Sequence, residues 1–397
     1  MSHTRLLIGI SVFWVALSMF SDGVTTLLLP AVLLGRIDDG SKATVLGLLT
    51  FAGLIAGMLV QPVAGVWSDR LRSFWGRRGT LGAGTLLLVG ALALFLAPGL
   101  LFIAVGYLVA QVAAGIAQAS QQGFLPDLVP QESRGLAAGL KGAADIGGGM
   151  IGFVVLGQLM GGGTLAPALL AIGGALILAF LLTVFLVREP RQRAHTTVDP
   201  IPRPADTFRV DLRRHRTFAW LVVSRFLFLL GTFAVGRFLL YFVADTLALD
   251  AATASEQAGT LLPGLGLVTV IASLPAGWAS DRFGRRPLMI AGATLGALGA
   301  LLMIWAATAV QILIFGSLMS LGTATFVGAN WALTADVVPK ERAAHFFGLA
   351  NVGTAGATAA AGLFGPLVDW ANAAHPGGGY TVLFSLAAFA FVVSGAV

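Results

Sequence analysis

The sequence predicts an all-α membrane protein with twelve transmembrane helices, arranged as two six-helix bundles related by a pseudo-twofold axis. Three observations lead to this fold class. The 397-residue chain is 57% hydrophobic and only 11% charged, whereas a soluble domain carries about 25% charged residues. Its apolar runs are long enough to cross a bilayer. A charged loop motif occurs twice, once in each half of the chain.

The apolar runs are continuous rather than alternating. This favours helices over a β-barrel, since lipid offers no partners for backbone N–H and C=O groups. The first run is too long for a cleaved signal peptide, and no cleavage site follows it. We predict spans at residues 6–35, 44–67, 79–97, 100–122, 136–160, 164–187, 218–245, 258–280, 288–306, 308–335, 345–370 and 379–397.

A polar segment at residues 188–217 separates the first six spans from the last six. It contains eight arginines and four prolines, so we expect an irregular linker with a short basic helix near 210–216 on the inner leaflet. The predicted domains are an N-terminal bundle at 1–187, this cytoplasmic linker at 188–217, and a C-terminal bundle at 218–397.

The positions of Lys and Arg predict the orientation in the membrane. With the N-terminus inside, 19 of the 24 basic residues fall on the cytoplasmic side, and the outside loops hold only Arg36 and Lys42. Cytoplasmic loops are enriched in Lys and Arg, so we expect both termini inside and a location in the inner (cytoplasmic) membrane. The net charge of +6 then reflects topology rather than nucleic-acid binding.

The charged loop motif has the frame G-x-x-S-D-R, a spacer, then G-R-R. One copy runs from Gly65 to Arg78 and the other from Gly277 to Arg286, with four extra residues in the first spacer. A second pair of matching segments begins at Asp127 (D-L-V-P-Q-E) and at Asp336 (D-V-V-P-K-E). Similar offsets in the same orientation indicate a parallel repeat about an axis along the membrane normal.

These features resemble the major facilitator superfamily of secondary transporters, whose G-x-x-x-D-R-x-G-R-R loop lies between spans 2 and 3 and again between spans 8 and 9. The spacer from Ser68 to Arg78 is similar to that of the sugar/cation symporter branch, which includes melibiose-type and sucrose/proton carriers. This resemblance matches Asp22 with a sugar-contacting Asp of melibiose-type carriers. Spans 2 and 4 lack the carboxylates of their cation site, and span 5 lacks the Gly-Pro pair of drug/proton antiporters.

The duplication and the resemblance imply a cytoplasmic gate that joins the two bundles in one state and releases them in the other. Asp69 lies at a helix end, where its carboxylate can meet the positive N-terminus of a helix in the opposite half. Gly65 and Gly76 are expected to allow a tight turn and close helix approach. The alternative is that the arginines only set topology. The predicted gate residues are Gly65, Asp69, Arg70, Gly76, Arg77, Arg78, Glu132, Arg134, Gly277, Asp281, Arg282, Gly284, Arg285, Arg286 and Glu341.

Five ionisable residues stand out within the spans, where charges are costly and mark functional sites: Asp22, Lys141, Asp145, Arg225 and Arg237. Asp22 and Arg237 lie about 24 and 29 Å from the cytoplasmic helix ends. We therefore expect a pair between the bundles near the outer gate, with Asp22 able to carry a proton. Lys141 and Asp145 are one turn apart and can pair, with a purely static pair as the alternative. For Arg225 the alternative is snorkelling to the interface.

Neutral polar residues complete the candidate substrate site. Gln118 and Gln122 share a face of span 4, and Asn330 and Trp331 lie in span 10. The resemblance places both spans around a cavity, where these residues would bind a hydroxyl-rich solute with Trp331 as a stacking wall. The alternative, for Gln111 and Gln121 as well, is hydrogen bonding between helices. Glycines of spans 5 and 11 are expected at close helix contacts, namely Gly148, Gly152, Gly362 and Gly365.

The sequence thus favours a secondary active transporter that takes up a small polar, sugar-like solute by alternating access and proton symport. The alternative is proton-coupled efflux of amphipathic drug-like compounds, and a sensor or scaffold without transport is disfavoured by the duplicated motif. The chain has no cysteine, and its five histidines are scattered. No nucleotide-binding loop, catalytic triad or metal-ligand spacing occurs, so no enzyme activity, cofactor or metal is expected. The expected partners are the solute, H⁺ and the lipid bilayer, for a monomer that does not bind nucleic acid.

Overall fold

The computed structural model describes residues 3–71, 76–130, 133–187, 216–338 and 343–397; within these ranges only the backbone is described at positions 3, 4, 69–71, 76, 126, 134, 135, 138 and 343–345. The described residues form 12 helical spans that are long and apolar enough to cross a membrane, and they contain no β-strand. This confirms the predicted fold class. Most span ends lie within a few residues of the prediction, but the eighth span begins at Ala251 rather than at 258.

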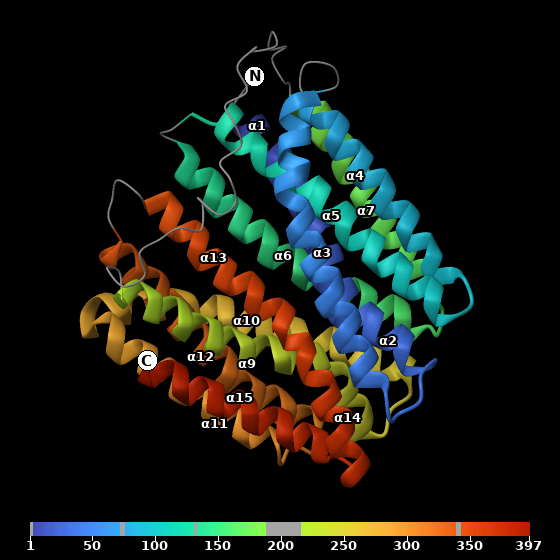
Figure 1. Ribbon diagram of the computed structural model, residues 1–397, viewed down its shortest axis with the longest axis vertical. Coiled ribbons are helices and arrows are strands. Elements are labelled where there is room, and N and C mark those ends of the chain that lie inside the picture. Colours follow the sequence, from blue (N-terminus) through green and yellow to red (C-terminus); the bar gives the residue numbers. More distant parts are fainter. Residues whose placement is uncertain (1–2, 72–75, 131–132, 188–215, 339–342) are drawn as a thin grey trace. The chain divides into compact units, whose positions relative to one another are not determined.

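The first half of the chain forms the first six spans (Figure 1). Their elements are α1 (His3–Gly23) with its continuation through a π-helix (Val24–Leu28) and α2 (Leu29–Leu34), α3 (Lys42–Leu71), α4 (Gly76–Ala93) with a 3₁₀ turn (Leu94–Leu96), α5 (Leu100–Leu128), α6 (Arg134–Gly161) and α7 (Ala166–Leu186).

The second half forms the other six. Its elements are α9 (Arg216–Leu247), α10 (Ala251–Phe283), α11 (Arg285–Met303), α12 (Ala309–Val337), α13 (Ala343–Ala360) with a 3₁₀ turn (Ala361–Phe364) and α14 (Gly365–Ala374), and α15 (Gly378–Ala396).

The chain divides into two compact units. Unit 1 comprises Met1–Arg36, Leu49–Val198 and Asp250–Thr260, and unit 2 comprises Ile37–Leu48, Asp199–Leu249 and Leu261–Val397. The start of α3 thus belongs to unit 2, and the start of α10 belongs to unit 1. The expected linker and its basic helix fall almost wholly in residues 188–215, outside the described ranges.

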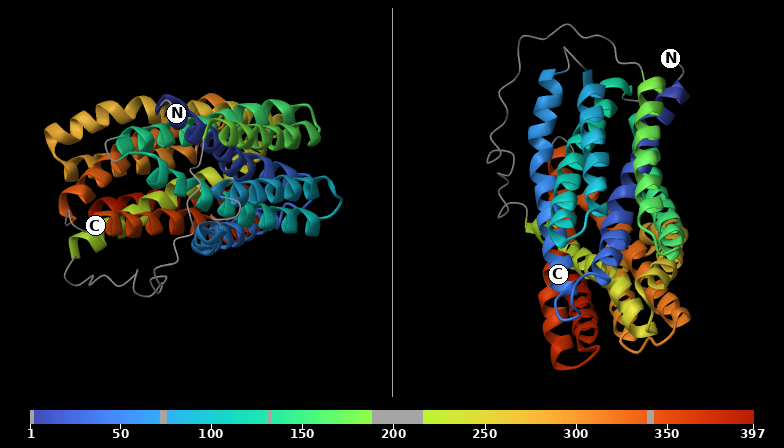
Figure 2. Two further views of the ribbon diagram at one scale, coloured as in Figure 1. Left: turned by 90° about the horizontal axis from the view of Figure 1, so that it is seen from above. Right: turned by 90° about the vertical axis from the view of Figure 1, so that its right-hand side faces the viewer.

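The third and fourth spans of each half pack as an antiparallel hairpin, α4 with α5 in unit 1 and α11 with α12 in unit 2 (Figures 1 and 2). A Cβ added at Gly84 would lie 2.9 Å from the Ala117 nitrogen, and one added at Gly292 would lie 2.7 Å from the Phe326 nitrogen. Small residues let helix backbones approach closely in a membrane. Because both glycines hold the same place in their hairpins, the sequence repeat is also a repeat of packing.

Three of the four glycines predicted at close helix contacts are found there. A Cβ at Gly148 would clash with the Val15 carbonyl of α1, and one at Gly152 would lie 2.9 Å from the Met19 carbonyl. In unit 2, a Cβ at Gly365 would clash with the Ala43 carbonyl at the start of α3. The pairs α1–α6 and α3–α14 are therefore held at backbone distance in these places, which confirms this part of the prediction.

Two spans depart from a regular α-helix in their interior. The first changes to a π-helix at Val24–Leu28, directly after Asp22, and π-helical turns are frequent at functional sites. The eleventh is interrupted by the 3₁₀ turn between α13 and α14.

Asp250 lies outside the spans, directly before α10, and caps this helix. Its carboxylate accepts a hydrogen bond from the Thr253 amide at 2.8 Å, and this bond lowers the pKa of the Asp250 carboxyl.

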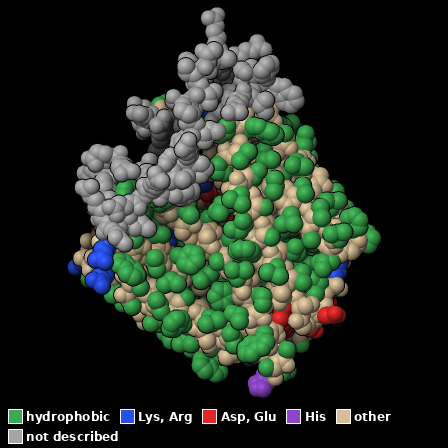
Figure 3. Space-filling model, in the orientation of Figure 1, with side chains coloured by type: hydrophobic (Ala, Val, Ile, Leu, Met, Phe, Trp, Pro, Cys, Tyr) green, Lys and Arg blue, Asp and Glu red, His purple; other side chains and the backbone are tan. Residues whose placement is uncertain are grey.

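Large apolar side chains lie on the outside of the helices. Leu170, Phe185 and Leu274 are among those that are exposed, and hydrophobic side chains are spread over much of the face shown in Figure 3. Such a surface suits hydrocarbon rather than water as a neighbour. The chain is a multi-pass membrane protein, and its polar groups inside the spans therefore need an explanation.

Candidate functional site

A stripe of polar residues joins α1 to α6 in unit 1. Lys141 and Asp145, one turn apart on α6, form the predicted ion pair at 2.7 Å. Ser18 of α1 donates to the other Asp145 oxygen at 3.2 Å. The Lys141 ammonium also lies 4.1 Å from the ring centroid of Trp14, close enough for a cation–π interaction. Both charged side chains are about one-third exposed, at 33% and 37%, so neither is sealed in the core.

Asp22 continues this stripe by one helical turn. Trp14, Ser18 and Asp22 are four residues apart along α1, so they share one face, and Gly149 lies four residues beyond Asp145 on α6. A Cβ at Gly149 would collide with the Asp22 carboxylate. The missing side chain of Gly149 therefore leaves the space that this carboxylate occupies. We call these residues the α1–α6 stripe.

The glutamines of α5 have different environments. Gln111 is buried and donates to Tyr107 at 2.7 Å and to Thr25 at 3.3 Å. Gln121 is also buried and donates to the Ile10 carbonyl at 2.6 Å. For Gln121, and for the Gln111–Thr25 bond, the interhelical alternative is confirmed. Gln118 accepts from Gln61 of α3 at 2.8 Å, while Gln122 is exposed. Gln118 therefore also makes the interhelical bond of the alternative, and among these four glutamines only Gln122 is exposed.

In unit 2 the guanidinium of Arg225 stacks on Trp331. Its Cζ atom lies 3.5 Å from the centroid of the indole ring, and Trp331 in turn stacks on Phe347 at 5.4 Å. Arg225 is only 1% exposed, so the snorkelling alternative is wrong. Asn330 is buried next to them and donates to the Leu221 carbonyl at 3.3 Å.

Arg237 lies three turns further along α9. It is buried, and its Nη2 atom lies 3.5 Å from the Thr358 carbonyl of α13. Asp22 belongs to unit 1 and Arg237 to unit 2. The expected pairing between them therefore stays a prediction.

The first loop motif makes an ion pair within unit 1. Arg77 Nε donates to Asp127 Oδ2 of α5 at 2.6 Å, and a Cβ at Gly123 would collide with the guanidinium, so this arginine lies flat across α5. Two guanidinium nitrogens of the neighbouring Arg78 are buried without a hydrogen-bond partner among the described residues. Asp127 was recognised in the sequence as part of the repeat but not as a partner of the motif.

The second loop motif makes the matching contact in unit 2. Arg285 Nε donates to Asp336 Oδ2 at 3.4 Å, and its Nη1 donates to Asp281 and Ser280. Gly284 has a φ of +94° and forms the turn between α10 and α11. The exposed Arg282 lies near the rings of Trp278 and Phe283, and Arg286 is exposed as well.

One expectation for this motif is wrong. Gly65 lies inside α3, as Gly277 lies inside α10, and a Cβ at either would meet no described atom within 4 Å. Neither glycine forms a tight turn or a close helix contact. The turn function belongs to Gly284, which needs the left-handed backbone region.

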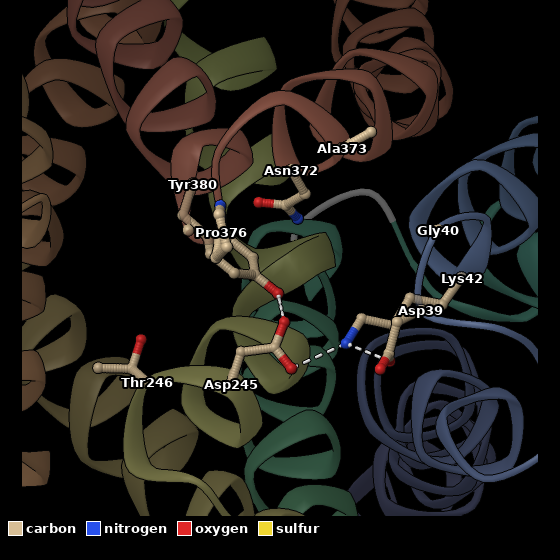
Figure 4. Close-up of a pocket in the computed structure, with 10 residues that line it drawn as sticks. Asp39, Gly40, Lys42, Asp245, Thr246, Asn372, Ala373, Pro376 and Tyr380 are labelled. Carbon is tan, nitrogen blue, oxygen red and sulfur yellow. Dashed lines mark hydrogen bonds and ion pairs between the residues drawn. The ribbon is translucent and has the colours of Figure 1, made fainter.

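A further polar cluster lies at the start of α3, within unit 2 (Figure 4). Lys42 pairs with Asp245 at 2.8 Å and with Asp39 at 3.1 Å, and the Tyr380 hydroxyl donates to the other Asp245 oxygen. The Lys42 side chain is only 5% exposed, although the sequence placed it in a loop. These groups line a cavity of about 510 Å³.

The carboxylate of Asp369 caps α3 beside this cluster. It accepts hydrogen bonds from the backbone amides of Ala43 and Thr44, the latter at 2.6 Å. The first amides of a helix lack intrahelical partners and carry partial positive charge. A buried carboxylate from the eleventh span thus satisfies the N-terminus of the second.

With this geometry established, comparison with known proteins identifies the family. A family model described as Major Facilitator Superfamily matches residues 12–255 and 226–397. The chain belongs to this superfamily. Family and fold together point to a transporter rather than an enzyme.

Curated relatives of this facilitator are distant. It is 26% identical over 352 residues to an uncharacterized protein of Mycobacterium tuberculosis (strain ATCC 25618 / H37Rv), covering 83% of this chain and 78% of that protein. It is 23% identical over 227 residues to a protein named "Multi-drug resistance efflux pump PmrA homolog" of Lactococcus lactis subsp. lactis (strain IL1403). That match covers 56% of this chain and only 54% of the relative.

Solved structures share the fold of this facilitator. A bacterial homolog of the human lysosomal transporter Spinster matches with a TM-score of 0.72 at 14% identity, over 99% of this chain and 92% of that one. The nucleoside transporter NupG matches with a TM-score of 0.73 at 14% identity, over 100% and 98% of the two chains. A D-xylose-proton symporter matches with a TM-score of 0.66 at 16% identity, over 99% and 95%.

The facilitator brings some predicted site residues together within each unit and leaves others apart. Lys141 and Asp145 are paired, and Arg225 contacts Trp331. Glu132 and Glu341 lie outside the described residues, and so do the side chains of Asp69, Arg70 and Arg134, while Gly76 is described only as the first residue of α4.

Sequence reasoning missed the cluster around Lys42. Two signals were available: Asp369 lay inside the predicted eleventh span, and Asp245 lay at the end of the seventh. An acidic residue in an apolar run requires a partner, but nothing in the sequence indicated that the partners were the first residues of α3.

Proposed function

We propose that this facilitator takes up a small polar, sugar-like solute across the cytoplasmic membrane by alternating access, together with protons. On this proposal the arginine-rich loops and both termini face the cytoplasm, because basic residues are retained on that side. The D-xylose-proton symporter and the nucleoside transporter are fold relatives whose named solutes are polar. Their low identity makes them support for the fold alone, so the proposal rests on the site.

The α1–α6 stripe is the observation that carries the proposal. It places two carboxylates and an ammonium group inside membrane spans, where ionisable residues are expensive and mark ion or substrate pathways. Lys141 and Asp145 compensate each other at 2.7 Å. Asp22 lies one turn beyond, against Gly149 and directly before a π-helical turn. We assign proton binding to Asp22 and a supporting role to the Lys141–Asp145 pair.

Protonation of Asp22 would couple the movement of the proton to the movement of the solute. A charged carboxylate within a span opposes closure of an apolar barrier around it, because its desolvation is costly. A neutral carboxyl removes that cost, so the proton shifts the balance between conformations. Gln118 and Gln122 on the same unit supply amide groups for a hydroxyl-bearing solute.

Reconstitution in liposomes with an imposed pH gradient tests this function. The expected result is uptake of one member of a panel of sugars and organic acids, with proton entry reported by a trapped pH-sensitive dye. Asp22→Asn is expected to abolish accumulation driven by the pH gradient while retaining exchange of internal for external solute. Asp250→Asn serves as the control, since Asp250 lies outside the spans.

Two outcomes contradict the proposal. An Asp22→Asn protein with intact proton-coupled uptake and an unchanged pH profile removes Asp22 as the proton carrier. Movement of cationic dyes outward, with no uptake of sugars or acids, favours the second candidate function. That candidate is proton-coupled efflux of amphipathic compounds, and its support is the similarity to the efflux pump homolog over 56% of this chain.

A further inference from the structure

Arg225 is a buried cation without a counter-ion among the described residues. It is 1% exposed, its Nε and Nη1 atoms have no hydrogen-bond partner, and no ion pair is formed with a described carboxylate. Two other cations of unit 2 differ in this respect. Lys42 is held by Asp39 and Asp245, and Arg285 is held by Asp281 and Asp336.

The lack of a partner has an energetic consequence. Arginine stays protonated in proteins, so Arg225 cannot relieve its burial by becoming neutral. Burying an uncompensated ion costs more than one cation–π contact returns. The stacked ring of Trp331, at 3.5 Å, therefore offsets only part of this cost. The part of the desolvation cost that the ring does not offset would be recovered when an anion binds the guanidinium, and this recovery would favour binding.

The surroundings of Arg225 suit an arriving polar group. The side-chain oxygen of Asn330, the residue before Trp331, is also buried without a hydrogen-bond partner among the described residues. Trp331 is only partly buried, and both Arg225 and Phe347 stack on its ring. Trp331 also packs against an apolar cluster that contains Phe218, Val338 and Phe346.

We propose that Arg225 is the anion-binding subsite of this facilitator, and that its solute carries a carboxylate or phosphate group beside its hydroxyl groups. Trp331 covers the guanidinium in the unloaded protein and moves aside when the anion pairs with it. The inference deepens the proposed function and rests on it, because it names the chemical class of the solute. A sugar acid or a sugar phosphate fits this class, and a neutral sugar does not. With one proton, a monoanion would cross without net charge.

Thermal unfolding of the purified protein tests the subsite without any transport assay. The probes are glucuronate and glucose 6-phosphate, glucose as their neutral counterpart, and acetate and inorganic phosphate as the smallest oxyanions, all at equal ionic strength with chloride. At least one oxyanion is expected to raise the unfolding temperature of the wild type in a saturable manner, and glucose is not. Comparing glucuronate with glucose 6-phosphate shows whether a carboxylate or a phosphate is preferred.

Two variants separate binding from a structural role. Arg225→Met keeps a flexible, unbranched side chain, shorter than that of arginine, and removes the charge. It is expected to lose the effect of oxyanions completely and, without ligand, to unfold at the same or a higher temperature than the wild type, because an uncompensated charge is gone. Arg225→Lys is expected to retain the effect with about tenfold weaker apparent affinity, since lysine lacks the planar fork. Arg36→Met, which removes an exposed arginine, is expected to respond to oxyanions as the wild type does.

The opposite pattern overturns the inference. If no oxyanion stabilises the wild type, and Arg225→Met unfolds at a lower temperature without ligand, the stacked arginine is structural. The proposed function is tested separately from the subsite. Proton-coupled uptake of a neutral sugar would refute the subsite and keep the function, whereas oxyanion binding without proton-coupled uptake in liposomes would do the reverse.

Discussion

Arg77 Nε donates to Asp127 Oδ2 at 2.6 Å and ties the start of α4 to the end of α5. Unit 2 repeats this contact between the matching residues Arg285 and Asp336 at 3.4 Å. The loop motif of this superfamily member is therefore anchored inside each unit, by a carboxylate that belongs to the other repeated segment. The position of the motif within its own unit is therefore fixed, whichever role the motif has between the units.

The two copies of the contact should differ in strength. The side chains of Arg77 and Asp127 are 10% and 20% exposed, against 26% and 58% for Arg285 and Asp336. Arg77→Gln is expected to lower the free energy of unfolding by about 1–3 kcal/mol, between the values for surface and buried pairs. Arg285→Gln is expected to lower it by a smaller amount, because this pair is more exposed to solvent. Chemical unfolding of the two variants checks this, and equal losses would mean that burial does not set the strength of the pair.

Gly149 is expected to be essential for the position of the Asp22 carboxylate. Alanine at this position places a Cβ against the carboxylate, so Gly149→Ala should displace Asp22 and shift the pH dependence of transport although no charge changes. Gly147→Ala on the same helix is the matched control, since its Cβ would meet no described atom within 4 Å. Within a helix this control should be neutral or slightly stabilising.

For Gly149 the measurement is the initial rate of uptake as a function of pH in proteoliposomes. A Gly149→Ala protein with the wild-type profile would show that Asp22 tolerates displacement. That result would weaken its assignment as the proton carrier.

Lys141 and Asp145 should depend on each other. Neutralising only one member leaves a charge without its partner inside a span. Lys141→Met and Asp145→Asn are each expected to reduce the amount of folded protein in the membrane and to abolish transport. The double variant should restore much of the folded protein, because it leaves no unpaired charge at these two positions. Fluorescence-detected size-exclusion chromatography measures the folded fraction.

Transport by the double variant tells whether the pair is only structural. If the pair merely joins α6 to α1, the double variant should transport as well as the wild type. Its continued inactivity, with restored folding, would support a functional role for the ionised groups. A folded fraction no better than that of the single variants would contradict their coupling.

Asp369 should stabilise unit 2 through the N-terminus of α3. Asp369→Ala removes the acceptor for the amides of Ala43 and Thr44 and is expected to cost about 0.5–2 kcal/mol, as for loss of an N-cap. Gly365→Ala should cost more, because its Cβ would meet the backbone carbonyl of Ala43 rather than a flexible side chain. Gly40→Ala, where a Cβ meets no described atom within 4 Å, is the control. Thermal unfolding ranks the three, and an Asp369→Ala protein as stable as the wild type would show that water replaces the carboxylate.

Much of the architecture was predictable because each constraint acts along the chain. Hydrocarbon forces every backbone group into a helix, so apolar run length gave the spans, and the repeated charged motif gave the relation between the halves. The Lys141–Asp145 pair was also accessible, since residues four apart on one helix face each other regardless of tertiary structure. The glycines of α6 likewise predicted a closely packed neighbouring helix, but they did not indicate which helix it is.

What the sequence by itself determined is therefore the number of helices, their type, and the side-chain pairs within a single helix. Only the tertiary structure decided that Arg77 contacts Asp127, that Gln121 binds a backbone carbonyl while Gln122 is exposed, and that Lys42 is buried beside Asp245 and Asp369. The physical reason is that membrane helices are apolar on nearly all faces. Their sequence then does not fix how each one is rotated about its axis, and that rotation selects the partner of every polar side chain.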